Sequence, residues 1–93
     1  MNQRTAKRLH DAQRAIGNIQ RFVSGKSFAD YYHDVYFQSA VERQFEVVSE
    51  ALNLAEYDEI DHQIIWDTVH FDLPPLRIRI ADLLTEFGLP HDE

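Results

Sequence analysis

The chain has 93 residues, of which 44% are hydrophobic and 27% are charged, and its formal net charge is −7. This composition indicates a globular domain and excludes a disordered or fibrous chain. Cysteine is absent, which excludes a disulfide framework, a thiol nucleophile and a cysteine-based zinc site. The apolar runs are too short to span a membrane and none follows Met1 as in a secretory signal, so we expect a cytoplasmic protein with no membrane partner.

Charge is distributed unevenly along the chain. Residues 1–26 carry a net charge of +5, whereas residues 27–93 carry −12. The cations of the first segment are Arg4, Lys7, Arg8, Arg14, Arg21 and Lys26, against Asp11 alone. Such a segment can form a nucleic-acid surface, or it can pack beside the acidic segments within the chain or across a dimer. We favour the second reading because an acidic chain repels phosphate at long range.

The first segment predicts a long amphipathic helix. Its apolar residues recur at steps of three and four, at Leu9, Ala12, Ile16, Ile19 and Val23. Lys7, Arg14 and Arg21 fall on another face. Gly25 suits the left-handed end of a helix and Ser27 suits an N-cap, so we expect a short helical turn at 28–32 after the first helix.

A second long helix is predicted from about Asp34 to Leu54. Its apolar face follows the line Phe37, Val41, Gln44, Val48, Ala51 and Ala55. Glu42 and Glu46 lie outside this face and form a like-charge pair that would cost a few tenths of a kcal/mol. A short connector then precedes residue 61.

The last helix is predicted to be broken by two prolines. Asp61 is a natural N-cap for a segment that contains Ile64, Ile65, Trp66 and Val69. Pro74 and Pro75 remove two amide donors, so we expect a restart there with Asp72 as the cap. The apolar face continues through Leu76, Ile80, Leu83, Leu84 and Phe87 and ends at Gly88.

These elements predict an all-α fold. No segment alternates with period two, so we assign no strand. The expected architecture is an antiparallel helical bundle in one domain spanning residues 1–93. Six Phe, four Tyr and one Trp are many for this length, and apolar surface left over after folding would favour a homodimer.

Few residues form a pattern typical of a catalytic or metal site. Asp30, His33 and Asp34 lie within helical reach of one another, as do Asp58, Asp61 and His62. Neither set has an established ligand spacing, so we expect no metal site and no cofactor. We expect His70 to be a partly buried helix histidine rather than a catalytic base. No serine lies in a nucleophile elbow, and no glycine-rich phosphate loop is present.

Two stretches of the chain resemble a known family. Residues 27–30 read S-F-A-D, and residues 40–52 read A-V-E-R-Q-F-E-V-V-S-E-A-L. Residues 57–67, Y-D-E-I-D-H-Q-I-I-W-D, and residues 72–76, D-L-P-P-L, follow. Together they resemble HepT-like proteins of the HEPN superfamily, although Ser49 stands where that family usually has glycine.

The resemblance implies an all-α bundle that forms a homodimer. HepT-like proteins are toxins paired with a minimal nucleotidyltransferase antitoxin, and they act as metal-independent ribonucleases. Their motif, R-x4-6-H and often H-x-Y, lies in a cleft at the dimer interface. The antitoxin silences the toxin by attaching AMP to the tyrosine, which Tyr57 matches in this chain.

The chain departs from the family where the catalytic motif is expected. Only Leu54, Ala55 and Glu56 stand between the 50–53 segment and Tyr57, so about one helix is missing. Ala55 occupies the place of the histidine. Arg4 and His10 match the motif by count alone, because a spacing of six places them on different faces of a helix. Metal-free RNA cleavage needs a group that moves a proton and a cation that stabilises the phosphorane, and neither is in place.

We therefore predict a HepT-like protein that lacks ribonuclease activity and acts as an oligomerising, partner-binding helical module. Removing a helix uncovers apolar faces, so we expect a dimer or larger assembly, with helix exchange as one route, and a nucleotidyltransferase antitoxin as partner. The alternatives are an active endoribonuclease toxin that binds RNA and a plain structural helical dimer. Candidates for the interface or the core are Phe37, Val41, Val48, Leu52, Ile65, Trp66 and Val69.

Overall fold

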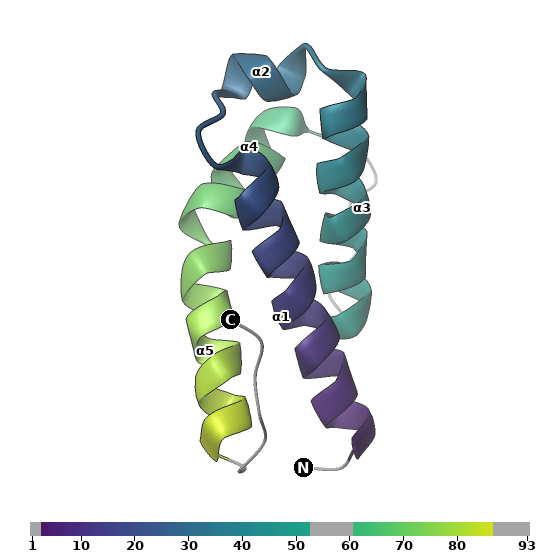
Figure 1. Ribbon diagram of the computed structural model, residues 1–93, viewed down its shortest axis with the longest axis vertical. Coiled ribbons are helices and arrows are strands. Elements are labelled where there is room, and N and C mark those ends of the chain that lie inside the picture. The colour runs from purple at the N-terminus through teal and green to yellow at the C-terminus, as the bar shows by residue number, and fades with distance from the viewer. Residues whose placement is uncertain (1–2, 53–60, 87–93) are drawn as a thin grey trace.

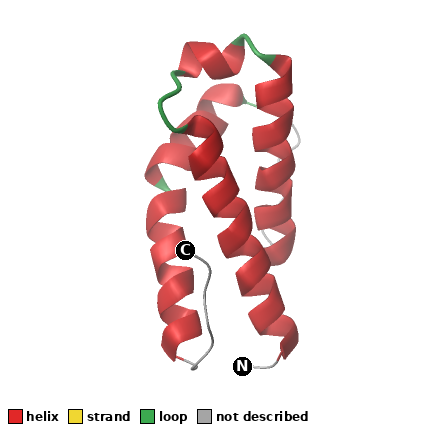
Figure 2. Cartoon of the chain, in the orientation of Figure 1, coloured by secondary structure: helices red, strands yellow, loops and turns green. Residues whose placement is uncertain are grey.

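The computed structural model describes residues 3–52 and 61–86, and five helices account for most of them (Figure 1). The helices are α1 (Gln3–Val23), α2 (Phe28–Tyr32), α3 (Val35–Leu52), α4 (His62–Phe71) and α5 (Leu73–Glu86). Within these described ranges there is no strand (Figure 2). The predicted all-α helical bundle is confirmed, although the continuation of the second long helix to Leu54 and the role of Phe87 lie outside the described residues.

Helix α1 is the centre of the bundle. It packs against α3 on one side and α5 on the other, whereas α3 and α5 hardly touch each other. The predicted stripe explains this position, since Ala12, Ile16, Ile19 and Val23 are buried and Leu9 is half-buried. A helix that is covered on two sides must bury residues beyond a narrow stripe, and Ala6, Gln13, Ala15 and Gly17 are buried too.

The turn between α1 and α2 uses the residues that the sequence indicates. Gly25 has φ +72°, a left-handed conformation that glycine adopts without the steric cost of a side chain. Ser27 then caps α2 reciprocally: its hydroxyl accepts from the Asp30 amide at 3.1 Å, and its own amide donates to the Asp30 carboxylate at 2.9 Å. This capping box fixes the direction of α2 across the end of the bundle (Figure 1).

Helix α3 is only half covered by its neighbours. Val41 and Val48 are its buried residues, while Phe37, Phe45, Val47, Ala51 and Leu52 are half-buried against the core. Of the expected like-charge pair, Glu42 lies 3.5 Å from His62 Nδ1 and Glu46 lies 3.9 Å from Arg43. Asn18 of α1 donates to Gln44 of α3 at 3.2 Å and links the two helices through a polar contact.

The join between α4 and α5 differs in detail from the prediction. Asp72 lies at the break as expected, and its carbonyl accepts from the Leu76 amide at 3.3 Å, as the carbonyl of an N-cap does. Its carboxylate has no capping role, because the amides that it would bind belong to Pro74 and Pro75, which have no N–H. Instead the Asp72 amide closes α4 by donating to Thr68 at 2.9 Å.

Candidate functional site

The seven candidates for interface or core lie in or against the core. Val41, Val48 and Val69 are buried, and Phe37, Leu52, Ile65 and Trp66 are half-buried and packed against the buried residues. Tyr57, the residue that resembles the family's AMP-accepting tyrosine, lies outside the described residues, as does Asp58.

Arg4 and His10 lie on the same helix and do not form a cleft between elements. In an α-helix, a spacing of six residues separates two side chains by about 120° around the axis and about 9 Å along it. Arg4 is exposed, and His10 is half-buried at an open depression on the surface of α1. The depression is lined by Gln3, Ala6, Lys7, His10, Asp11 and Arg14.

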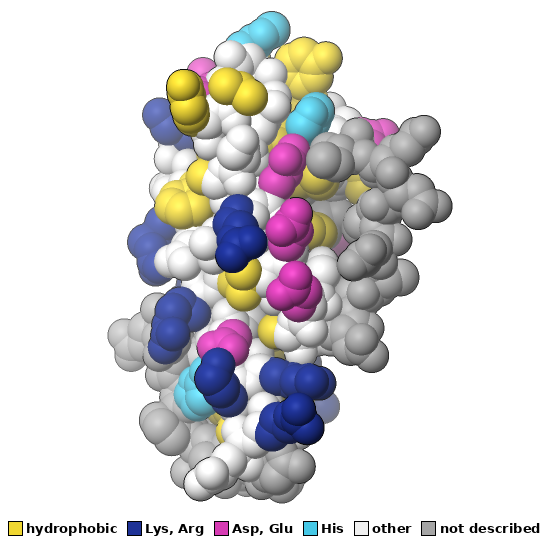
Figure 3. Space-filling view, turned by 90° about the vertical axis from the view of Figure 1, so that its right-hand side faces the viewer, with side chains coloured by type: hydrophobic (Ala, Val, Ile, Leu, Met, Phe, Trp, Pro, Cys, Tyr) yellow, Lys and Arg dark blue, Asp and Glu magenta, His cyan; other side chains and the backbone are white. Residues whose placement is uncertain are grey.

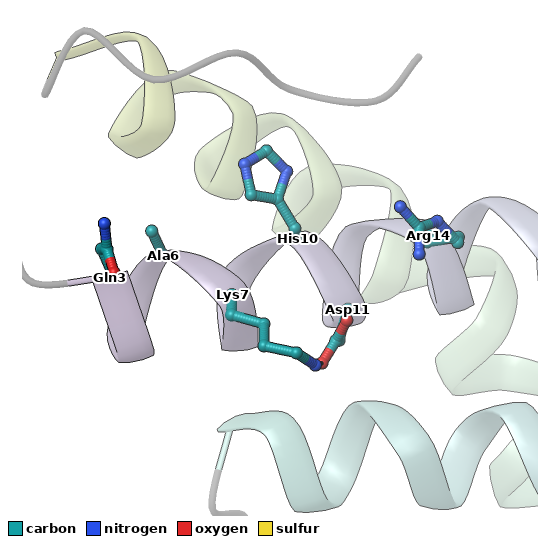
Figure 4. A pocket seen from close by; sticks show the side chains of 6 residues that line it. All are labelled: Gln3, Ala6, Lys7, His10, Asp11 and Arg14. Carbon is teal, nitrogen blue, oxygen red and sulfur yellow. The ribbon is translucent and has the colours of Figure 1, made fainter.

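This depression on α1 has a basic lining. Figure 4 shows His10 extending to one side of the helix, with Lys7 and Asp11 directed to the other. Lys7 and Asp11 form an ion pair of 2.9 Å, and both are solvent-exposed. The pair therefore adds little stability. His10 and Arg14, which also line the depression, lie one helical turn apart.

The basic residues of α1 lie on its solvent face, separate from the acidic residues of α3. Arg4, Lys7, Arg8, Arg14 and Arg21 are all exposed. On α3, Glu42, Glu46 and Glu50 recur at every fourth residue and so follow one ridge. Figure 3 shows basic side chains gathered mostly towards one end of this face and acidic side chains in a row nearer the other.

The candidate metal-ligating acids act as helix caps. Asp30 is bound to Ser27, and this bond lowers the pKa of the Asp30 carboxyl below its usual value. Asp34 accepts from the amides of Tyr36 and Phe37 at 3.0 and 3.1 Å, at the start of α3. Asp61 accepts from the Gln63 and Ile64 amides at 3.0 and 3.2 Å. Among the described residues, no three His, Cys, Asp or Glu side chains gather as a metal site.

A polar cluster of Tyr31, His62 and Glu42 joins three helices. The Tyr31 hydroxyl lies 3.0 Å from His62 Nδ1, and that nitrogen lies 3.5 Å from Glu42 Oε1. Ser27 caps the helix that carries Tyr31, and Asp61 caps the helix that begins with His62. These caps fix the start of both helices. The cluster therefore ties α2 and α4 to α3 at one end of the bundle.

Aromatic rings pack around the ring of Tyr31, which is fully buried. The ring of Tyr31 is fully buried and lies 5.3 Å from the Trp66 ring and 5.7 Å from the Phe37 ring, measured between centroids. Phe28 completes the cluster at 6.2 Å from both Tyr31 and Trp66. Edge-to-face and tilted pairs of this kind add stability beyond the buried area.

Burial determines the chemistry of Tyr31. Burial, with a smaller contribution from the Glu42 carboxylate, raises the pKa of Tyr31 to about 12. The hydroxyl therefore stays protonated well into the alkaline range and keeps its hydrogen bond with His62 Nδ1 there. A buried, protonated phenol is a poor nucleophile, so the cluster is suited to holding helices together rather than to covalent catalysis.

His62 has no cation beside it in the described part of the chain. Its contacts are the Tyr31 hydroxyl, the Glu42 carboxylate and the ring of Tyr32 at 5.9 Å. A phosphorane needs a positive charge close to the group that moves the proton, and this environment is aromatic and acidic. The Tyr31–His62 contact spans 31 residues, and helical periodicity gives no signal for it.

His70 is more exposed than expected. Instead of being partly buried, it lies on the solvent side of α4, with Nδ1 2.8 Å from the Trp66 carbonyl and its ring 4.5 Å from the Trp66 ring. The half-buried indole occupies the core side of this turn, which leaves His70 outside. Its role is local packing.

Comparison with known protein families, with characterised proteins and with solved structures finds no match to this chain. No helix in the described ranges is both long and apolar enough to cross a lipid bilayer.

Proposed function

We propose that the chain is a HepT-like HEPN protein without ribonuclease activity, and that it acts in the cytoplasm as an oligomerising, partner-binding helical module. The observation that carries this proposal is the large apolar surface left open to solvent. Among residues 3–52 and 61–86, seven large apolar side chains are exposed: Phe22, Tyr32, Val35, Tyr36, Ile64, Phe71 and Ile78. Exposed apolar side chains that adjoin one another favour association with another chain.

The loose contact between α3 and α5 supports the same proposal. Both helices pack against α1 and hardly against each other. A bundle short of one helix would have this arrangement, because the missing helix would have bridged its flanks. The half-buried apolar residues of α3, such as Phe45 and Leu52, are then available to a second chain.

The loss of the nuclease is supported by the residues themselves. HepT-like proteins have an arginine and a histidine in the segment that corresponds to the interval between residue 53 and Tyr57. This chain has only three residues there. In the described part, the histidine with the most side-chain contacts, His62, lies beside a carboxylate and aromatic rings. Purified protein incubated with RNA in EDTA should leave the RNA intact, and cleavage by the pure protein would overturn this part of the proposal.

The proposed partners are a second copy, as a dimer or larger assembly with helix exchange as one route, and a nucleotidyltransferase antitoxin. No cofactor is needed for either. Tyr57 is the proposed acceptor of AMP: its phenol oxygen would attack the α-phosphorus of ATP, pyrophosphate would leave, and a base would take the phenol proton. Mass spectrometry after incubation with the nucleotidyltransferase and ATP tests this, with Tyr57→Phe as the variant that should stay unmodified.

The second candidate function, RNA cleavage, is favoured by one observation. His10 and Arg14 line the same depression on α1 and place a histidine and an arginine one helical turn apart. If this site cleaves RNA, His10→Ala should abolish cleavage while His33→Ala, on an exposed histidine elsewhere, should not. A third candidate, a plain structural helical dimer, would self-associate yet fail to bind the nucleotidyltransferase.

A further inference from the structure

Three large apolar residues of the consecutive helices α4 and α5 are exposed. Ile64 and Phe71 are seven residues apart on α4, which is two turns of a helix, and Ile78 lies on α5 beyond the break at Asp72. Their exposed fractions are 51%, 75% and 64%. Side chains this large and this exposed gain nothing from the fold of their own chain. We call these three residues, with the exposed Pro75 beside them, the outer stripe.

The outer stripe faces away from the core. Phe71 and Ile78 each precede a buried residue, Leu73 and Ile80, by two positions. Within α5, two positions correspond to about 200° around the helix, so Ile78 points away from the buried Ile80. Phe71 is the last residue of α4, and its exposure places it outside the core. Helix α5 therefore packs one apolar side against α1, while Ile78 on its other side is exposed.

Acidic residues surround the outer stripe. Asp67, Asp72, Asp82 and Glu86 are exposed on α4, on α5 and at their join. Arg79 is the exposed cation within residues 62–86, since Arg77 is half-buried and donates to Gln20 of α1 at 2.6 Å. The net charge around the stripe is negative, so a nucleic acid, an anionic lipid surface or the same stripe of a second copy would be repelled.

We propose that the outer stripe is a docking site for a basic amphipathic helix of a partner protein. Apolar residues at three- and four-residue spacing on that helix would cover Ile64, Phe71 and Ile78, and its lysines or arginines would meet the surrounding carboxylates. On α4 alone, Ile64 and Phe71 lie about 10 Å apart along the axis, at 1.5 Å per residue. The proposal rests on the partner-binding part of the proposed function and adds the surface and the chemistry of the partner.

The test is a fluorescence-anisotropy titration with two labelled peptides of equal length. One has leucine at three- and four-residue spacing and lysine elsewhere, and the other has glutamate in place of each lysine. The unaltered protein should bind the lysine peptide and not the glutamate peptide. Equal binding of both peptides, or binding of neither, would contradict the proposal.

Variants locate the binding surface. Phe71→Ser combined with Ile78→Ser should weaken binding of the lysine peptide about tenfold or more, since apolar anchors carry most of the energy of such interfaces. The matched control is Tyr36→Ser on α3, because Tyr36 is 86% exposed and lies outside the stripe. Both proteins should keep their helical circular dichroism. Equal affinity of the double variant and the unaltered protein would overturn the proposal.

Light scattering separates this proposal from the proposed function. The double variant should keep the oligomeric state of the unaltered protein, because a second copy is not the proposed occupant. If the double substitution dissolves the oligomer, the stripe binds a second copy, and this proposal fails while self-association stands. If the protein is a monomer that still binds the lysine peptide at the stripe, the self-association part of the proposed function fails and this proposal stands.

Discussion

The hydroxyl of Tyr31 lies 3.0 Å from Nδ1 of His62 and connects the short helix α2 to the first residue of α4. The phenol is fully buried, while the His62 side chain is about a quarter exposed. The contact therefore joins a buried hydroxyl to an imidazole that is partly exposed to solvent. The Tyr31 hydroxyl is the atom through which α2 makes this polar contact with α4.

Tyr31→Phe tests the contribution of that hydroxyl to stability. The ring would keep its contacts with Trp66 and Phe37, so only the bond to His62 is lost. We expect a loss of about 1 kcal/mol in the free energy of unfolding, measured by urea denaturation. Tyr32→Phe is the matched control, because Tyr32 is exposed. Equal stability of the Tyr31→Phe and unaltered proteins would show that water replaces the bond without cost.

Tyr31 also makes the free energy of unfolding depend on pH in the alkaline range. Its pKa is raised from 10.0 to about 12 by burial and by Glu42. A group whose pKa is raised by folding stabilises the protein below its unfolded pKa, and that stabilisation disappears as pH rises through the folded value. The difference in unfolding free energy between the unaltered protein and Tyr31→Phe should therefore shrink between pH 10 and pH 12. A difference that stays constant over this range would contradict the assignment.

Gly17 allows α1 and α5 to approach closely. A Cβ placed there would lie 3.1 Å from Nη2 of Arg77, whose other nitrogen bonds Gln20. Inside a helix, alanine stabilises a protein by up to about 1 kcal/mol relative to glycine. In the protein with Arg77 present, Gly17→Ala should stabilise by less than this, because the new methyl group displaces the guanidinium. In an Arg77→Ala background the displacement is absent, and the same substitution should stabilise by the full amount.

A double-mutant cycle from urea denaturation checks the Gly17–Arg77 relationship. The double variant should be more stable than the sum of the two single effects on the free energy of unfolding predicts. Additive effects would mean that the guanidinium moves aside freely and that glycine is not required at this position.

Ile16 tests the central place of α1. It is fully buried on the side that meets the neighbouring helices. Ile16→Ala should cost about 3 kcal/mol, the usual loss for a large core residue. The same substitution at Ile78, which is exposed, should change stability by less than about 0.5 kcal/mol. Chemical denaturation of both variants measures the contrast, and similar losses at the two positions would contradict the arrangement.

Local signals in the sequence predict the helices and their ends well. Gly25, Ser27 and Asp61 act as the turn and the caps that their residue types indicate, because a cap depends on residues only two or three positions away. The break before Pro74 follows from the missing amide. The same missing amides make Asp72 an N-cap by its carbonyl alone, which residue type does not reveal.

Contacts between distant segments could not be predicted in the same way. The pairing of Tyr31 with His62, the approach of Gly17 to Arg77 and the burial of Gln13 depend on how the helices pack. Periodicity identifies the apolar side of a helix but not the helix that covers it. For the same reason, the sequence does not reveal that Ile64, Phe71 and Ile78 are exposed while Leu73 and Ile80 are buried.

The solution mass tests the central claim most directly. Size-exclusion chromatography with light scattering should give a dimer or larger assembly of the 10.9 kDa chain, which then retains a nucleotidyltransferase when one is added. A monomer of 10.9 kDa that binds no nucleotidyltransferase would mean that the exposed apolar residues serve no association, and the account of an oligomerising, partner-binding module would be wrong.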